Sequence, residues 1–300
     1  MRADGPTGTP SATRALLAPA PAPVDDAVRA RLRERLTGEM ATAAGHLAPT
    51  DQVLITVPLL RQARQRPDRL AEPDGAFAWK PAFVRRSLGL SIVHACVTGR
   101  FATPLEAAGP VSSDAVADWT RTGWRTFHWE PWMAGLPAGA RAAVLADAVG
   151  WASSLWTAFD WRAIPRLPEF GGAYDQWGCP TAHPVRLKAR SELRVELDGP
   201  DDPAGPTAGS PVPDRPTVLV SVSGGCPGPG WSEELAFVAL VAGVRSPSRP
   251  VPARVLGLWP DAGAHAAVDI DADTLMAAVD RVVVTLEAVV AARASRAVSR

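Results

Sequence analysis

The stretch Val185-Arg-Leu-Lys-Ala-Arg-Ser-Glu-Leu-Arg-Val-Glu-Leu197 alternates apolar or small residues with charged ones over thirteen positions. Successive side chains of a β-strand point to opposite faces of a sheet. The period of two therefore predicts one half-buried strand, with an apolar face on a core and a charged face in solvent. The charged face would carry Arg186, Lys188, Arg190, Glu192, Arg194 and Glu196.

Further apolar segments follow this strand and indicate an α/β protein. Thr217–Ser223 predicts a central strand buried on both faces, and Val255–Trp259 predicts another strand. Between them, Ser232 is suited to cap a helix that runs to about Val244. Asp273 is suited to cap a last helix with a long apolar stripe.

The N-terminal half is predicted to be helical. Val28, Leu32, Leu36 and Met40 recur every fourth residue, which indicates an amphipathic helix over residues 25–46. Further helices are expected over 51–66, interrupted by Pro58, and over 82–97. A helical insert at about 100–165 follows and contains seven of the eleven tryptophans. We interpret these as core residues rather than a stacking platform for bases, because they lie within apolar helices.

Residues 1–23 are rich in Pro, Ala and Thr and have no hydrophobic period, so we expect a disordered tail. The sequence then predicts a single α/β domain over 24–300. In it, a helical N-terminal half and flanking helices surround a small mixed β-sheet.

Charge and cysteine content narrow the possible classes of protein. Lys+Arg and Asp+Glu both total 31, so the chain has no net charge that would attract a polyanion. Between Arg61 and Arg100, however, there are eight basic residues and three acidic ones. Cys96, Cys179 and Cys226 form no Cys-x-x-Cys pair, which argues against structural zinc, iron–sulfur clusters and disulfides. Isolated cysteines and the lack of any 18-residue apolar run favour a cytoplasmic protein without membrane contact.

Four short motifs occur in order along residues 80–260. They are Gly89-Leu-Ser-Ile-Val-His94, Ala189-Arg-Ser-Glu192, Val220-Ser-Val-Ser-Gly-Gly225 and Glu233-x-x-x-Phe237. In this order the chain resembles the RecB-type branch of the PD-(D/E)XK nuclease superfamily. The resemblance implies a restriction-endonuclease-like fold. In that fold a Gly/His helix and a helical insert precede a strand ending in an acid, a strand with Asp/Glu-x-Lys, and a helix with Gln-x-x-x-Tyr.

The resemblance places the catalytic positions at His94, Glu192, Ser221 and Ser223, and the motif-helix positions at Glu233 and Phe237. In such nucleases, clustered carboxylates hold Mg²⁺, which activates the attacking water, and a lysine offsets the developing charge. Here Ser221 replaces the second carboxylate and Ser223 replaces the lysine, and no Asp/Glu-x-Lys occurs at any register. The standard active site is therefore expected to be lost, with no cofactor, or with Mg²⁺ at Glu192 and His94 if the protein is active.

Two alternatives concern individual residues at this site. Glu192 and Arg194, with Asp175 upstream, form a possible shifted active site, but arginine stays protonated and cannot act as a general base. For His94, an ordinary hydrogen-bonded histidine on a packed helix is favoured over a metal ligand.

The sequence thus predicts a nuclease-like protein that has lost catalysis and binds nucleic acid. Six cations would contact phosphates without reading bases: Arg186, Lys188, Arg190, Arg194, Arg85 and Arg86. Alternatively, these cations do no more than keep the exposed face of a strand in contact with water. Two other functions stay open: an active metal nuclease with a non-standard site around Glu192, and a non-enzymatic subunit that docks on a larger DNA-processing protein through its Trp-rich helices.

Overall fold

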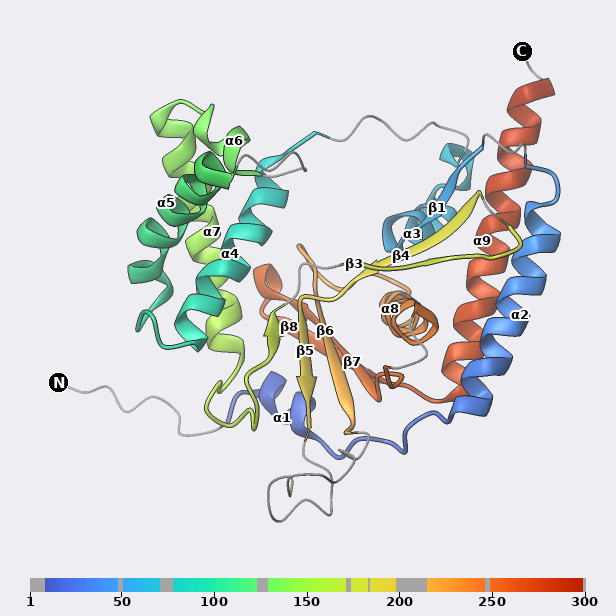
Figure 1. Cartoon of the computed structure of the whole chain (residues 1–300), viewed down its shortest axis with the longest axis horizontal. Coiled ribbons are helices and arrows are strands. Elements are labelled where there is room, and N and C mark those ends of the chain that lie inside the picture. Colours follow the sequence, from blue (N-terminus) through green and yellow to red (C-terminus); the bar gives the residue numbers. More distant parts are fainter. Residues whose placement is uncertain are drawn as a thin grey trace.

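The computed structural model describes residues 9–47, 51–70, 78–122, 129–170, 174–182, 184–197, 215–245 and 249–298. Within these ranges, nine α-helices surround β-sheets of three and five strands (Figure 1). The predicted α/β class is confirmed, although the strands form two mixed sheets rather than one.

The five-stranded sheet has the order β2-β5-β6-β7-β8. Its strands are β2 (Glu169–Phe170), β5 (Leu193–Glu196), β6 (Thr217–Val222), β7 (Arg254–Trp259) and β8 (Ala264–Asp269). β6 and β7 are parallel and joined through helix α8 (Trp231–Arg245), whereas the other neighbours are antiparallel. β7 is buried at every position, as expected of an apolar strand in the middle of a sheet.

The three-stranded sheet has the order β1-β4-β3. Its strands are β1 (Val53–Ile55), β3 (Tyr174–Gly178) and β4 (Val185–Arg190). β4 is parallel to β1 and antiparallel to β3. The apolar residues of β4 face the core, while Arg186 is exposed and Lys188 is half-buried on the outer face.

The predicted thirteen-residue strand is divided between the two sheets, which corrects the sequence interpretation. β4 ends at Arg190 and β5 begins at Leu193, so Ser191 and Glu192 form the passage from one sheet to the other. At this passage the alternation fails: Ser191 is half-buried and Glu192 is fully buried. The reason is that the Glu192 N–H donates to the Val220 carbonyl at 2.8 Å, which joins the segment to β6.

One core lies between the two sheets and the helices α2 (Asp26–Ala44), α3 (Val57–Gln65), α8 and α9 (Ala272–Val298). α8 is buried over the whole stretch 235–244, because other elements surround it (Figure 1). As predicted, α2 buries Leu32, Leu36 and Met40. The expected helix over 51–66 is wrong in its first part, since β1 occupies 53–55. Pro58 lies in the first turn of α3 instead of interrupting it, because N–H groups of the first turn have no partner within the helix.

A second core covers the opposite face of the five-stranded sheet. It is built by α4 (Pro81–Val97), α5 (Pro104–Thr122), α6 (Trp129–Ala134) and α7 (Ala138–Ala158) (Figure 1). The predicted insert is thus helical. Gly89 lets α4 approach α7 closely: a Cβ at this position would lie 2.4 Å from Cε3 of Trp151. Trp129 and Trp151 are buried in this core, in agreement with their assignment as packing residues.

Within the expected disordered tail over 1–23, Ser11–Leu17 instead form helix α1. Leu16 is fully buried, and Thr13 Oγ1 accepts a hydrogen bond from the Asp160 N–H at 2.8 Å. Arg254, 5% exposed, donates to the carbonyls of Ala15, Ala18 and Pro19 at 2.9–3.1 Å. Arg254 thus supplies hydrogen-bond donors to carbonyl groups at the C-terminal end of α1. No local sequence pattern predicts this contact, because Arg254 is distant in the sequence. Residues 1–8 lie outside the described residues.

None of the helices in the described ranges is both long and apolar enough to cross a membrane.

Candidate functional site

Strands β5 and β6 bring the two central motif positions together. Their antiparallel register begins with the pair Leu193–Val220, and the Glu192 N–H also donates to the Val220 carbonyl, so that Glu192 lies next to β6 at the end of this ladder. Ser221 is half-buried, and its neighbour on the other side is Gly257 of β7. Ser223 follows the end of β6 and is fixed by its N–H, which donates to the Leu258 carbonyl at 2.8 Å. Glu192 therefore lies against the end of β6, the strand that contains Ser221 and precedes Ser223.

The Glu192 carboxylate is 0% exposed and fully engaged by its surroundings. Oε1 accepts a hydrogen bond from Nη2 of Arg86 on α4 and lies 3.0 Å from Nε of Arg190 on β4. Oε2 accepts the N–H of Val222 at 2.6 Å. Two guanidinium groups and one backbone amide thus surround a single buried carboxylate, an arrangement that we call the Glu192 triad (Arg86, Arg190 and Glu192).

The electrostatic balance of the Glu192 triad is set by burial and by the two cations. Burial raises the pKa of the Glu192 carboxyl above its usual value, and the charges of Arg86 and Arg190 and the Val222 N–H work in the opposite direction. A buried carboxylate that lost a cation would be strongly destabilised. The triad therefore compensates a buried charge between α4, β4 and β5.

The donor set around Glu192 does not fit Mg²⁺. This ion needs several oxygen ligands in near-octahedral geometry, but both Glu192 oxygens face hydrogen-bond donors and two cations. His94 is exposed on α4, with its ring 4.8 Å from that of Phe170 on β2. In the described ranges, no three His, Cys, Asp or Glu side chains are grouped so that they could hold a metal.

Asp175 acts electrostatically on Arg194, as the shifted active site with Glu192 requires, but each of the three residues also has another ion-pair partner. Asp175 is buried on β3 and pairs with Arg245 at the end of α8. Arg194 lies 3.9 Å from Glu169 of β2, and burial lowers the pKa of its guanidinium. Each of these residues therefore has another partner than the one that the shifted site requires.

At least four of the six predicted phosphate-binding cations are engaged with acids in the described part of the chain, which corrects the expectation that these cations form one basic face. Arg86 and Arg190 pair with Glu192, and Arg194 with Glu169. Arg85 lies 3.5 Å from Asp147 and 3.2 Å from Asp261. Sequence alternation could not reveal the pairs of Arg85, Arg86 and Arg194, because their acids come from distant segments. Arg186 and Lys188 keep the predicted position on the outer face of β4.

The two motif-helix residues, Glu233 and Phe237, make contacts that hold the fold together. Phe237 is part of the core around α8. Glu233, in the first turn of α8, lies 3.2 Å from Arg64 of α3 and 3.1 Å from Arg281 of α9. These contacts tie the start of α8 to two other helices, a role that the motif alone did not indicate.

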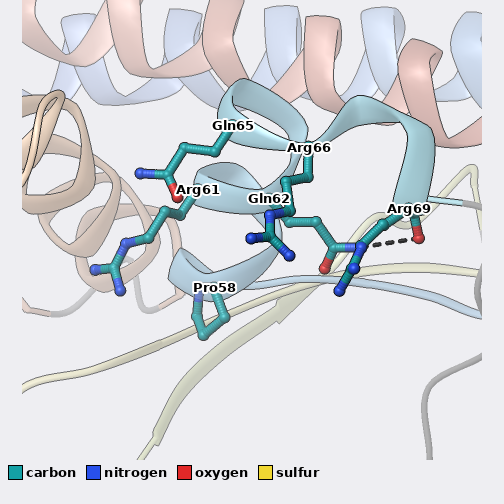
Figure 2. A pocket seen from close by; sticks show the side chains of 6 residues that line it. All are labelled: Pro58, Arg61, Gln62, Gln65, Arg66 and Arg69. Atoms are coloured by element: carbon teal, nitrogen blue, oxygen red, sulfur yellow. Dashed lines mark hydrogen bonds between the residues drawn. The ribbon is translucent and has the colours of Figure 1, made fainter.

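A hollow of about 300 Å³ lies over α3 and the 3₁₀ turn η1 (Pro67–Arg69), and sequence reasoning did not identify it. Figure 2 shows the side chains that line it. They are Pro58, Arg61, Gln62, Gln65, Arg66 and Arg69. The only sequence signal was the local excess of basic residues that begins at Arg61. We call it the α3 hollow.

Taken together, the residues at the motif positions neutralise charge and connect elements. A buried carboxylate held between two guanidinium groups offers neither an open metal position nor a free base. Comparisons with protein-family models, curated proteins and solved structures gave no match to this chain.

Proposed function

We propose that the chain is a catalytically degenerate, cytoplasmic protein of the PD-(D/E)XK nuclease-like type, which binds nucleic acid without cutting it. The order of its elements supports the proposal. Helix α4 and the helical insert precede β5, β6 and α8, and this is the order that the resemblance implies. The acid position, Glu192, contacts the end of the strand that contains the first degenerate position, Ser221.

The single observation that carries the loss of catalysis is the Glu192 triad. In a metal nuclease the acid at this position must be open to a cation that also reaches the substrate. Here the carboxylate is fully buried, and Arg86 and Arg190 supply the positive charge in place of a metal. Side chains of the protein thus stabilise the acid, and the hydroxyls of Ser221 and Ser223 add no charge.

Nucleic-acid contact is assigned to the outer face of the three-stranded sheet. There Arg186 is exposed, and it pairs in register with Leu54 of β1 and Gly178 of β3. Lys188 lies two residues further along the same face, beside Gln176. Both cations point away from the core, so they can meet phosphates of a backbone without base-specific contacts.

The test is a titration of Mg²⁺ or Mn²⁺ with single- and double-stranded DNA, in which cleavage and binding are measured together. We expect no cleavage, and binding that weakens as salt increases. The Arg186→Glu/Lys188→Glu variant should bind more weakly and lower the salt slope by about one to two units. Exposed arginines at 31 and 162, on other elements, supply the matched control Arg31→Glu/Arg162→Glu.

Two outcomes would contradict the proposal. Metal-dependent cleavage that disappears in Glu192→Gln, with the fold retained by circular dichroism, would show an active nuclease with a non-standard site. Absence of any binding to either DNA would end the nucleic-acid assignment and direct attention to protein partners.

A further inference from the structure

The α3 hollow is formed by one face of a helix and the turn that follows it. Pro58, Arg61, Gln62 and Gln65 recur at helical spacing, so their side chains lie on the same side of α3. Gln62 Nε2 donates to the carbonyl of Arg69 at 2.9 Å, which holds η1 against the helix (Figure 2). The hollow is therefore held in place by the fold.

The charge at the hollow is positive and only partly compensated. Arg61 donates through Nε and Nη2 to the two carboxylate oxygens of Glu234, at 2.9 and 2.6 Å, which fixes its guanidinium. Arg66 and Arg69 are exposed, and in the described part of the chain their guanidinium groups have no acid or carbonyl partner. Asp68 lies between them in sequence but does not line the hollow.

The geometry suits an oxyanion. Figure 2 shows the side chains of Arg61, Arg66 and Arg69 extending toward the same side of the helix and turn. Guanidinium groups present planar forks of N–H donors that match phosphate oxygens, and a neutral ligand would leave these donors without partners. The amides of Gln62 and Gln65 add neutral polar groups at the rim. No acidic side chain lines the hollow to repel an anion.

We propose that the α3 hollow is a phosphate-binding site. In it, Arg66 and Arg69 bind the phosphate oxygens, and Arg61 adds a guanidinium group that Glu234 holds in place. Its ligand is a phosphate group, which either a small phosphorylated molecule or a nucleic-acid backbone can supply. The inference does not rest on the assignment of Arg186 and Lys188, because the two sites lie on different elements.

The experiment uses the full chain and two probes. Inorganic phosphate is titrated calorimetrically, and a fluorescein-labelled oligothymidylate is titrated by anisotropy. We compare the wild type with Arg66→Ala/Arg69→Ala. Loss of two charge-assisted contacts is expected to weaken binding by about tenfold or more. Arg31→Ala/Arg162→Ala is the matched control, because it removes the same charge from exposed positions elsewhere.

The outcomes separate the sources of the phosphate group. Saturable binding of inorganic phosphate that is lost only in the Arg66/Arg69 variant supports a small-molecule phosphate. Oligonucleotide binding that weakens in this variant, without measurable binding of inorganic phosphate, supports a nucleic-acid backbone. The inference is overturned if the Arg66/Arg69 variant and the control behave alike with both probes.

The same data distinguish this inference from the proposed function. If Arg186→Glu/Lys188→Glu abolishes oligonucleotide binding and the Arg66/Arg69 variant leaves the binding of both oligonucleotide and inorganic phosphate unchanged, the proposed function stands and the phosphate site fails. If inorganic phosphate binds at the hollow while no DNA binds, the phosphate site stands and the proposed function fails.

Discussion

Removal of the Arg86 side chain tests the Glu192 triad most directly. The change Arg86→Met keeps the bulk of the side chain but removes one of the two cations that face a fully buried carboxylate. Loss of one partner from a buried ion pair costs about 3–5 kcal/mol. Because Arg86 is itself 30% exposed and Arg190 remains, we expect the lower end, about 3 kcal/mol of unfolding free energy at pH 7.

The stability cost of Arg86→Met should depend on pH, because it depends on the ionisation of Glu192. Burial raises the pKa of the Glu192 carboxyl in the folded state. The free energy of unfolding therefore falls as pH rises through that raised pKa, because Glu192 must then ionise in a buried position. Without Arg86 the pKa rises further. The cost of Arg86→Met should therefore be largest at neutral pH and should shrink as pH falls toward the ordinary range of a glutamate, where the carboxyl can be protonated.

The assay is urea unfolding followed by circular dichroism between pH 5 and pH 8. Arg85→Met is the matched control, because its partners Asp147 and Asp261 have side chains 51% and 36% exposed. Such surface pairs contribute at most about 1 kcal/mol. If Arg86→Met costs no more than Arg85→Met, or if its cost is the same at pH 5 and pH 8, the reasoning about the triad is refuted.

Three further substitutions test packing and backbone features, each read as a change in unfolding free energy. Gly89→Ala places a methyl group against the Trp151 ring and should cost about 2 kcal/mol, since overpacking exceeds the gain in helix propensity. Arg254→Ala removes the donors that hold α1 and should cost about 2–3 kcal/mol, with faster tryptic cleavage within residues 9–20. Gly230→Ala should cost about 1–2 kcal/mol, because φ is +78° and a guanidinium nitrogen lies 1.5 Å from the new Cβ position.

Matched controls exist for the two glycine substitutions. Gly150→Ala, at an exposed position of helix α7, meets nothing within 4 Å and should be neutral or slightly stabilising. Gly225 has the same sign of φ as Gly230 but open space around it, so Gly225→Ala isolates the backbone strain from the clash. Equal costs for a substitution and its control would contradict the packing explanation. For Arg254, unchanged protection of residues 9–20 would show that α1 is held by other contacts.

Local patterns predicted most of the regular structure, because each pattern reports burial on one side of a helix or strand. The four-residue spacing of Leu32, Leu36 and Met40 predicted α2, and the apolar run after Thr217 predicted β6. The alternation in 185–197 predicted strand structure correctly but not its division. A period of two specifies which side chains face inward and contains no information about the neighbouring strand.

The candidate site was predictable in position and not in chemistry. Motif order predicted neighbouring strands for Glu192 and Ser221, and in the structure Glu192 directly precedes β5, which pairs with β6. The partners of Glu192 could not be predicted, since Arg86 is 106 residues away and its contact depends on how α4 packs on the sheet. The same holds for α1, whose contacts with Arg254 span more than 230 residues. Residues that meet only in the folded chain leave no periodic signal.

The passage between β4 and β5 has a consequence for how the molecule opens. Because one continuous segment belongs to both sheets, the three-stranded sheet cannot separate from the five-stranded sheet without drawing Ser191 and Glu192 out of their places. The amide proton of Val222 is bonded to the Glu192 side chain rather than to a backbone carbonyl. Its rate of exchange with solvent deuterium therefore reports rupture of the link between the sheets, separately from the opening of either sheet alone.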